Sequence, residues 1–127
     1  MFWKVAFFVE GETPSYQVLK RDEERNLALV KLNKNNLTTV GFAEFGSLRF
    51  GQRVFLVGKR GMEEIINEGV IKKYNSEIIK TNILENQNLK GSPLFNIKGL
   101  LIGLTLIDSY GQVSAIPISE IKEFTGF

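Results

Sequence analysis

The chain has 127 residues, of which 43% are hydrophobic and 24% charged, and its formal net charge at pH 7 is +2. This size and composition are typical of one globular domain that can bury a hydrophobic core. The small net charge argues against a nucleic-acid partner. The pairs Lys59-Arg60 and Lys72-Lys73 are therefore interpreted as solvated surface positions rather than phosphate contacts.

Cysteine and histidine are both absent from the sequence. Without cysteine the chain can form no disulfide, thiol nucleophile or thiolate metal site. Without histidine it lacks the commonest metal ligand and the commonest general base near neutral pH. A Ser-His-Asp or Cys-His mechanism built from these residues alone is excluded, and we expect no metal or cofactor.

The first apolar run, residues 2–9, is interrupted by Lys4 and followed by Glu10-Gly11. It is too short to cross a membrane, which takes about 20 apolar residues. The positive start and small-residue cleavage site of a signal peptide do not occur in it. We therefore predict a β-strand, expect no direct membrane insertion, and leave the cellular compartment open.

Alternating apolar and polar residues, punctuated by glycines, predict many short strands along the chain. Before a polar loop at residues 33–36, the predicted strands are residues 2–9, 17–20 and 27–32, with a charged connection at residues 21–25. The last of these strands is almost entirely apolar, which predicts that both of its faces are covered.

After the polar loop the predicted strands are residues 39–42, 52–57, 65–74, 77–81, 93–95, 100–107 and 112–116. The sequence Asn-Ile-Lys-Gly at residues 96–99 predicts a hairpin turn. The chain end predicts a short helix with Ser119 as its N-cap and Glu120 in its first turn. This pattern predicts an all-β barrel or sandwich with a short C-terminal helix.

Several stretches carry a family resemblance when they are taken in order. They are residues 9–12 (VEGE), 21–32 (RDEERNLALVKL), 45–54 (FGSLRFGQRV), 68–71 (EGVI), 81–93 (TNILENQNLKGSP) and 112–117 (QVSAIP). Together they resemble the trypsin-like protease domain of the HtrA/Deg family. Residues 81–93 resemble that family's segment around the catalytic serine without a gap, and the resemblance extends over nearly the whole chain.

The resemblance implies a fold of two six-stranded β-barrels with the active site between them. We therefore expect one trypsin-like domain over residues 1–127, with residues 1–32 as part of the first barrel and residues 37–127 as a complete second barrel. The chain would begin after the strand that presents the family's histidine. Packing in the core is the default interpretation for Trp3, Phe7 and Phe8, and an exposed apolar patch for a partner is the alternative. An incomplete barrel exposes a strand edge, so we predict a homodimer, or strand exchange, through residues 1–32 that buries these aromatics and Phe2.

Matching the catalytic positions places Asn26 at the acid and Lys90 at the nucleophile. Asparagine is neutral, and a lysine amine is charged near neutral pH unless it is strongly desolvated. The oxyanion hole would use the backbone N–H groups of Lys90 and Asn88, and Asn82 replaces an aspartate common in the family. We therefore expect the chain to be a catalytically inactive homologue of the family, that is, a pseudoprotease.

Without catalysis, three roles stay open: binding an extended peptide along the former substrate groove, a structural or oligomerising module, or one part of an envelope quality-control protein. For the first role we predict contacts with Asn88, Leu89, Lys90, Gly91, Ser92, Leu104, Thr105 and Leu106, within the segments 88–92 and 104–108. The enzyme alternatives are a non-standard hydrolase that uses Lys90 and Ser92, and a fragment of an active serine endopeptidase. If Lys90 and Ser92 are not catalytic, Lys90 is an exposed loop lysine and the Ser92 hydroxyl bonds nearby backbone.

Overall fold

The computed structural model describes residues 15–34 and 37–127. The chain divides into two compact units, residues 1–39 and 40–127. The predicted strand at residues 2–9, with its four aromatics Phe2, Trp3, Phe7 and Phe8, lies outside the described residues. No helix in the described part of the chain has the length and apolar character needed to cross a membrane.

The first unit contains a two-stranded antiparallel hairpin of β1 (Tyr16–Asp22) and β2 (Leu27–Leu32). The strands pair in register from Tyr16 opposite Leu32 to Asp22 opposite Leu27, with one irregularity between Val18 and Lys20. Residues 23–26 form the turn, in which the Arg25 N–H donates to the Asp22 carboxylate at 3.0 Å. The predicted strand at 17–20 is thus extended, and the charged connection begins two residues later than predicted because Arg21 and Asp22 belong to β1.

The prediction that residues 27–32 are covered on both faces is wrong for the described structure. β2 has the predicted bounds, but only Leu27 is buried, whereas Ala28 and Lys31 are exposed. A two-stranded sheet offers no second layer of its own, so an apolar strand in it keeps one face open.

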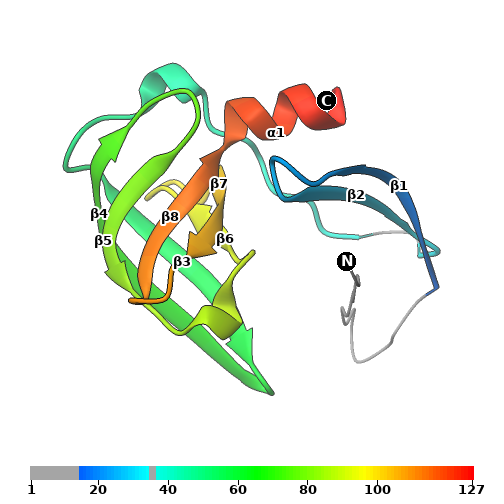
Figure 1. Ribbon diagram of the computed structural model, residues 1–127, viewed down its shortest axis with the longest axis horizontal. Helices are drawn as coiled ribbons and strands as arrows, with labels where there is room; N and C mark the ends of the chain where they lie inside the picture. Colours follow the sequence, from blue (N-terminus) through cyan, green and yellow to red (C-terminus); the bar gives the residue numbers. More distant parts are fainter. Residues whose placement is uncertain (1–14, 35–36) are drawn as a thin grey trace. The chain divides into compact units, whose positions relative to one another are not determined.

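The second unit is a closed antiparallel barrel of six strands, shown in Figure 1. Its strands are β3 (Arg53–Arg60), β4 (Glu63–Tyr74), β5 (Ile79–Leu84), β6 (Pro93–Phe95), β7 (Leu101–Ile107) and β8 (Gln112–Pro117). They are hydrogen-bonded in the order β3-β4-β5-β8-β7-β6, and the ring closes between β6 and β3. The mostly β architecture with a barrel and a short C-terminal helix confirms the predicted fold class.

The barrel interior is filled by alternate side chains of its strands. In β5 the pattern is strict: Ile79, Thr81 and Ile83 are buried, whereas Lys80 and Asn82 are exposed. The other strands and the preceding loop contribute the remaining core: Ala43, Leu48, Val54, Leu56, Ile71, Leu89, Leu94, Ile102, Ile107, Val113 and Ala115. Closure leaves every strand paired on two sides, which is why a small barrel can bury a core without a second layer.

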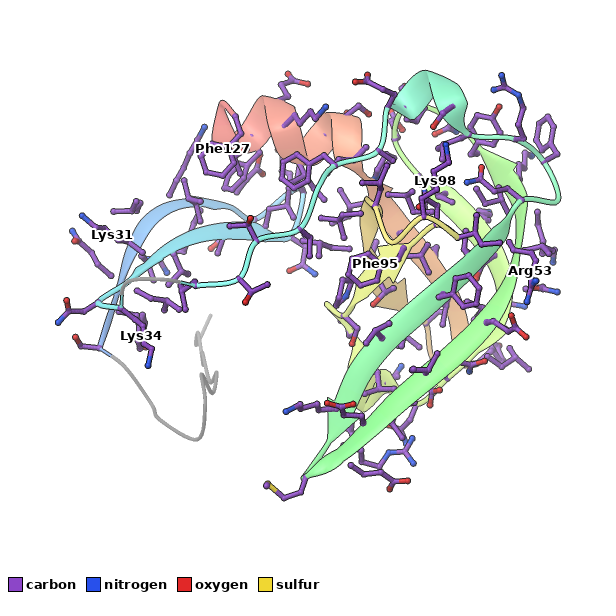
Figure 2. All side chains as sticks on the ribbon, turned by 180° about the vertical axis from the view of Figure 1, so that it is seen from behind. Lys31, Lys34, Arg53, Phe95, Lys98 and Phe127 are labelled. Atoms are coloured by element: carbon purple, nitrogen blue, oxygen red, sulfur yellow. The ribbon has the colours of Figure 1, made fainter. Side chains whose placement is uncertain are left out.

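The outer face of β3 carries a different set of side chains. Arg53, labelled in Figure 2, is exposed and pairs with the Glu68 carboxylate of β4 at 2.6 Å. Its guanidinium also lies 5.6 Å from the centre of the Phe55 ring. Phe55 is opposite Phe95 of β6. Alternation along β3 therefore separates the apolar core from a mixed apolar and charged exterior.

Most predicted strands of the barrel are confirmed, with bounds that differ by up to three residues. The largest shift concerns residues 77–81, since β5 begins at Ile79 and ends at Leu84. The cause is local: the Asn75 side-chain oxygen accepts hydrogen bonds from the N–H groups of Glu77 at 2.8 Å and Ile78 at 2.9 Å. This turn keeps residues 75–78 out of the strand.

Residues 39–42 do not form the predicted strand. Phe42 makes only an isolated parallel bridge with Leu101. The Leu101 N–H donates to the Gly41 carbonyl and the Ala43 N–H donates to the Leu101 carbonyl, both at 2.9 Å. The segment therefore pairs with β7 only at the first residue of that strand, Leu101, and this pairing is too short to form a strand.

The C-terminal helix α1 (Ile118–Thr125) has Glu120 in its first turn, as predicted, but Ser119 is not its N-cap. Pro117 occupies that position, and the Ser119 hydroxyl oxygen is buried without a hydrogen-bond partner among the described residues. The helix ends at Thr125 and is capped by Gly126, whose φ of 79° is left-handed and whose N–H donates to the Lys122 carbonyl at 2.8 Å.

Candidate functional site

Asn26, the residue at the predicted acid position, lies in the turn between β1 and β2. It is exposed, and its φ of 58° is left-handed. Its N–H donates to the Glu23 carbonyl at 3.3 Å, which closes the turn. Asparagine tolerates this backbone conformation better than most residues. The turn by itself therefore accounts for an asparagine at this position.

The loop that follows β5 is a tight turn with a short 3-10 helix over Gln87–Leu89. Its N-cap is Asn86, whose side-chain oxygen accepts a hydrogen bond from the Asn88 N–H at 2.9 Å. Leu89 points into the barrel and is only 2% exposed. A capped start and a buried apolar residue at its end hold this turn in one conformation.

Two backbone N–H groups in this turn, those of Asn88 and Lys90, are at the positions where the family resemblance implies the donors of an oxyanion hole. The Lys90 N–H donates to the Gln87 carbonyl at 3.1 Å, and the Asn88 N–H is taken by the Asn86 side chain. Both donors are therefore used inside the turn.

Lys90 and Ser92 differ in exposure. Lys90 is exposed, whereas Ser92 is half-buried beside β3. A Cβ atom added to Gly58 would lie 2.8 Å from the Ser92 hydroxyl oxygen, so this hydroxyl is close to the β3 backbone. The Ser92 N–H donates to the Leu89 carbonyl at 3.1 Å, but no hydrogen bond of its hydroxyl is found within residues 37–127. The backbone of Ser92, rather than the predicted hydroxyl, ties it to the turn.

The turn is joined to β7 at Thr105. The Gly91 N–H donates to the Thr105 carbonyl at 2.8 Å, and the Thr105 N–H donates to the Ser92 carbonyl at 2.9 Å. The buried Thr105 hydroxyl donates to the Leu89 carbonyl at 3.3 Å. Gly91 has a φ of 90°, which favours glycine. The structure thus brings together the predicted segments 88–92 and 104–106, with Thr105 as a structural link between them.

The end of β7 presents backbone groups without a partner on one side. In an antiparallel pair, successive residues bond alternately to the two neighbouring strands. Thr105 bonds toward Gly91 and the Asp108 N–H donates to the Gln112 carbonyl of the β8 side at 3.2 Å. The N–H and C=O of Ile107 therefore point to the side of Gly91, beyond the end of the β6 pairing, and none of the described residues bonds them there.

Asn82, which the resemblance places where the family commonly has an aspartate, has a structural contact. It is exposed on β5, and its side-chain oxygen accepts a hydrogen bond from the Val70 N–H of β4 at 2.8 Å. This contact lies next to Gly69, where an added Cβ would collide with the Asn82 side chain. Glycine at that position leaves room for the amide.

Glu85 anchors the turn and was not singled out from the sequence. Its carboxylate accepts hydrogen bonds from the Asn86 N–H at 2.9 Å and the Asn67 amide at 3.0 Å, and pairs with Arg60 at 3.2 Å. Its own N–H donates to the Gly111 carbonyl at 2.8 Å. The side chain is 11% exposed. The only sequence signal is an acidic residue directly after an apolar strand, which is too common to identify an anchor.

The electrostatics of Glu85 follow from these contacts. The hydrogen bond from the Asn86 N–H, followed by that from the Asn67 amide, lowers the pKa of Glu85 below its ordinary value of 4.5. Burial acts in the opposite direction, and the charge of Arg60 adds to the lowering. Glu85 is therefore an ionised anchor at neutral pH. No group of three or more acidic side chains that could hold a metal ion occurs within residues 15–34 and 37–127.

Comparison with known proteins relates the chain to one family. Residues 4–104 match the family model described as "Trypsin-like peptidase domain". The chain is 28% identical over 133 residues to the "Probable serine protease do-like" of Buchnera aphidicola subsp. Acyrthosiphon pisum, a match that covers 91% of this chain and 28% of the relative.

Two further relatives carry similar names. The chain is 26% identical over 104 residues to the "Probable periplasmic serine endoprotease DegP-like" of Halomonas elongata, covering 75% of this chain and 22% of the relative. It is 25% identical over 130 residues to the "Serine protease HTRA1" of Xenopus tropicalis, covering 91% and 28%. The chain thus spans 22% to 28% of the length of these three relatives.

Proposed function

Because the chain belongs to the trypsin-like peptidase domain family and is related to the HtrA/DegP serine proteases, we propose that it is a homologue without peptidase activity that binds an extended peptide along β7. The observation that carries the proposal is the engagement of the Asn88 and Lys90 N–H groups inside their own turn. An oxyanion hole needs such donors aimed at the charge that develops in the transition state. A turn that uses both donors internally offers no such stabilisation.

The residue types support the same proposal. A trypsin-like mechanism needs a serine nucleophile, a histidine base and an acid that orients the histidine. These 127 residues contain no histidine, and Asn26 and Lys90 stand at the acid and nucleophile positions. A histidine supplied by another part of a longer protein would still meet a neutral amide and an ammonium group at these two positions.

Peptide binding by strand addition needs only an open backbone edge. The Ile107 N–H and C=O lie at such an edge, next to the Gly91–Thr105 hydrogen bond. Leu106 is half-buried and adjoins it, so it offers apolar surface to a peptide side chain. Main-chain pairing of this kind tolerates many sequences. The ligand we propose is therefore an extended peptide segment without a strict sequence requirement.

Activity is tested with fluorescent casein and with ester substrates. We expect no turnover from the wild-type chain, from Lys90→Ser, or from Asn26→Asp combined with Lys90→Ser, because no base is present in any of them. Turnover that disappears in Ser92→Ala but persists in Ser109→Ala, an exposed serine of the β7–β8 turn, would instead support the hydrolase that uses Lys90 and Ser92.

Binding is tested by NMR titration with a peptide library and with the same library methylated on alternate backbone nitrogens. We expect shifts of the Ile107 and Gly91 amides with the first library and about tenfold weaker binding with the second, because methylation removes the pairing donors. Equal binding of both libraries, or shifts confined to another face, would contradict strand addition.

The assembling role is the alternative proposal from the family resemblance. Residues 1–32 would then join two copies of the chain in a homodimer, which is the commonest symmetric assembly. Light scattering at high micromolar concentration would give the mass of a dimer, and Phe7→Lys would reduce it to that of a monomer. A monomeric wild-type chain would refute this role and would leave the peptide-binding proposal unaffected.

A further inference from the structure

The outer surface of β4, β5 and β8 contains a concave region of about 460 Å³, distinct from the turn that carries Lys90. It is lined mainly by charged and polar side chains, among them Lys72, Lys73, Lys80, Gln112 and Ser114. Pockets of this volume hold small molecules in other proteins. The three lysines belong to two neighbouring strands, β4 and β5.

A β-bulge places all three lysines on the same side of the sheet. In the β4–β5 pairing, Ile71 is opposite Thr81 and Lys73 is opposite Lys80, so Lys72 is an extra residue in β4. Ile71 and Thr81 are buried, whereas the three lysines are exposed. Without the bulge, strict alternation would turn either Lys72 or Lys73 toward the core.

This arrangement is electrostatically unfavourable by itself. Lys73 and Lys80 are direct cross-strand partners, and like charges in that position destabilise a sheet. By contrast, Arg53 and Arg60 of β3 pair with carboxylates at 2.6 Å and 3.2 Å. Among the described residues, no ion pair involves Lys72, Lys73 or Lys80.

Asp108 is the one acid among the described residues that line the region, and it is engaged in its own turn. The Asp108 carboxylate accepts hydrogen bonds from the N–H groups of Tyr110 at 2.9 Å and Gln112 at 3.0 Å. The Thr81 hydroxyl is also engaged, because it donates to the Val113 carbonyl at 2.6 Å. The region therefore combines three unpaired positive charges with a single acid that already has two other partners.

We propose that this concave region is a binding site for a small molecule that carries a phosphate or diphosphate group, which replaces the interpretation of Lys72 and Lys73 from the sequence as solvated surface positions. A lysine ammonium is a compact charge with three donors, which suits phosphate oxygens approached from several directions. The Ser114 hydroxyl and the Gln112 amide line the same region and make no hydrogen bond with the described residues, so they supply neutral donors. A ligand with two or more negative charges relieves the repulsion between Lys73 and Lys80 and explains why the bulge gathers them.

The first test measures the binding of inorganic pyrophosphate, with inorganic phosphate and sulfate for comparison. Binding is measured at low ionic strength by calorimetry and by NMR shifts of the backbone amides. We expect saturable binding with shifts at Lys72, Lys73 and Lys80. Lys73→Gln combined with Lys80→Gln should weaken it about tenfold or more, because two charge-assisted contacts are lost.

The matched control removes the same charge from elsewhere in the barrel, with Lys59→Gln combined with Lys98→Gln, two exposed positions. We expect less than a twofold change. An equal loss of affinity in both double variants would mean that only the net charge of the chain matters, and it would overturn the proposal. The absence of saturable binding by the wild-type chain would also overturn it.

Thermal unfolding separates binding from a structural role. Without pyrophosphate, Lys80→Gln should unfold at the same temperature as the wild-type chain or higher, because it removes a repulsive pair. The rise in unfolding temperature that pyrophosphate produces in the wild-type chain should be lost in the variant. A variant that unfolds several degrees lower without ligand would mean that Lys80 is needed for the fold, and would contradict the proposal.

Discussion

The turn at residues 86–92 and the end of β7 lie on either side of the Gly91–Thr105 hydrogen bond and use their backbones in opposite ways. In the turn, the N–H groups of Asn88 and Lys90 are both bonded internally. At the end of β7, the N–H and C=O of Ile107 face outward without a partner among the described residues. The two N–H groups of the turn are thus not available to bond a negatively charged ligand atom, whereas the backbone groups of Ile107 are available to bond another backbone.

This difference separates two properties that an active peptidase combines. Catalysis depends on free donors in the turn, whereas substrate pairing depends on the free edge of the strand. A chain can lose the first and keep the second, because the hydrogen bonds that close the turn do not involve Ile107. Substitutions in and around the turn therefore test whether the turn and the strand edge behave as separable parts.

Leu89→Ala should have the largest effect. Leu89 is 2% exposed and packs in the barrel core, where an added Cβ on Gly58 would come within 3.1 Å of its side chain. Removing a buried leucine costs about 2–5 kcal/mol of unfolding free energy. Chemical denaturation would measure that loss, and peptide binding at β7 should weaken with it because the turn is joined to Thr105.

Leu84→Ala is the matched control, since Leu84 lies five residues earlier and is 64% exposed. We expect a change within about 0.5 kcal/mol. If both variants lose the same stability, Leu89 does not anchor the turn and the two regions are not coupled through it.

Glu85→Gln should have an intermediate effect that depends on pH. The substitution keeps the size of the side chain but removes the charge that the Asn86 N–H and the Asn67 amide stabilise, at a cost of about 1–2 kcal/mol near pH 7. Because the pKa of Glu85 is lowered on folding from 4.5, its stabilisation is full above that pH and is lost as the pH falls through the folded value. Chemical denaturation should therefore show a smaller difference in unfolding free energy between Glu85→Gln and the wild-type chain at pH 3 than at pH 7.

Arg60→Gln serves as the comparison for this variant. The Arg60 side chain is 49% exposed, so its pair with Glu85 should contribute at most about 1 kcal/mol. A loss in Arg60→Gln that matches the loss in Glu85→Gln would mean that the ion pair, rather than the amide hydrogen bonds, holds the turn.

Lys90→Ala should have the smallest effect. Lys90 is exposed, and its backbone N–H is retained by the substitution. We expect a change in unfolding free energy within about 0.5 kcal/mol and less than a twofold change in peptide binding. A large loss of binding would show that the Lys90 side chain contacts the peptide, and the turn would then be part of the binding surface.

Much of the fold follows from local pattern. The alternation in residues 79–83 predicts a strand with one buried face, and the Asn-Ile-Lys-Gly turn forms with its Gly99 N–H bonded to the Asn96 carbonyl at 3.0 Å. The predictions that failed have different local causes. Asn75 delays the start of β5, and Pro117 rather than Ser119 precedes the helix.

The candidate site was predictable in its residue types but not in its bonding. The assignment of Asn26 and Lys90 to the acid and nucleophile positions needs only residue identity and the family resemblance, and it stays a prediction. The anchoring by Glu85 is not, because Asn67 and Arg60 are 18 and 25 residues away along the chain. Long-range pairs of this kind leave no periodic signal.

What residue order alone determined is the all-β class, the positions of most strands and the absence of histidine, because these depend on alternation and composition. Only the tertiary structure decided which backbone groups are free. Ile107 is left open on one side because the β6 pairing begins at Pro93, opposite Leu104, and does not reach Ile107. The same holds for Lys72, Lys73 and Lys80: their charges are evident in the sequence, but their gathering on one surface requires the β4–β5 bulge. Strand register brings distant residues together, and no local pattern encodes the register of both strands at once.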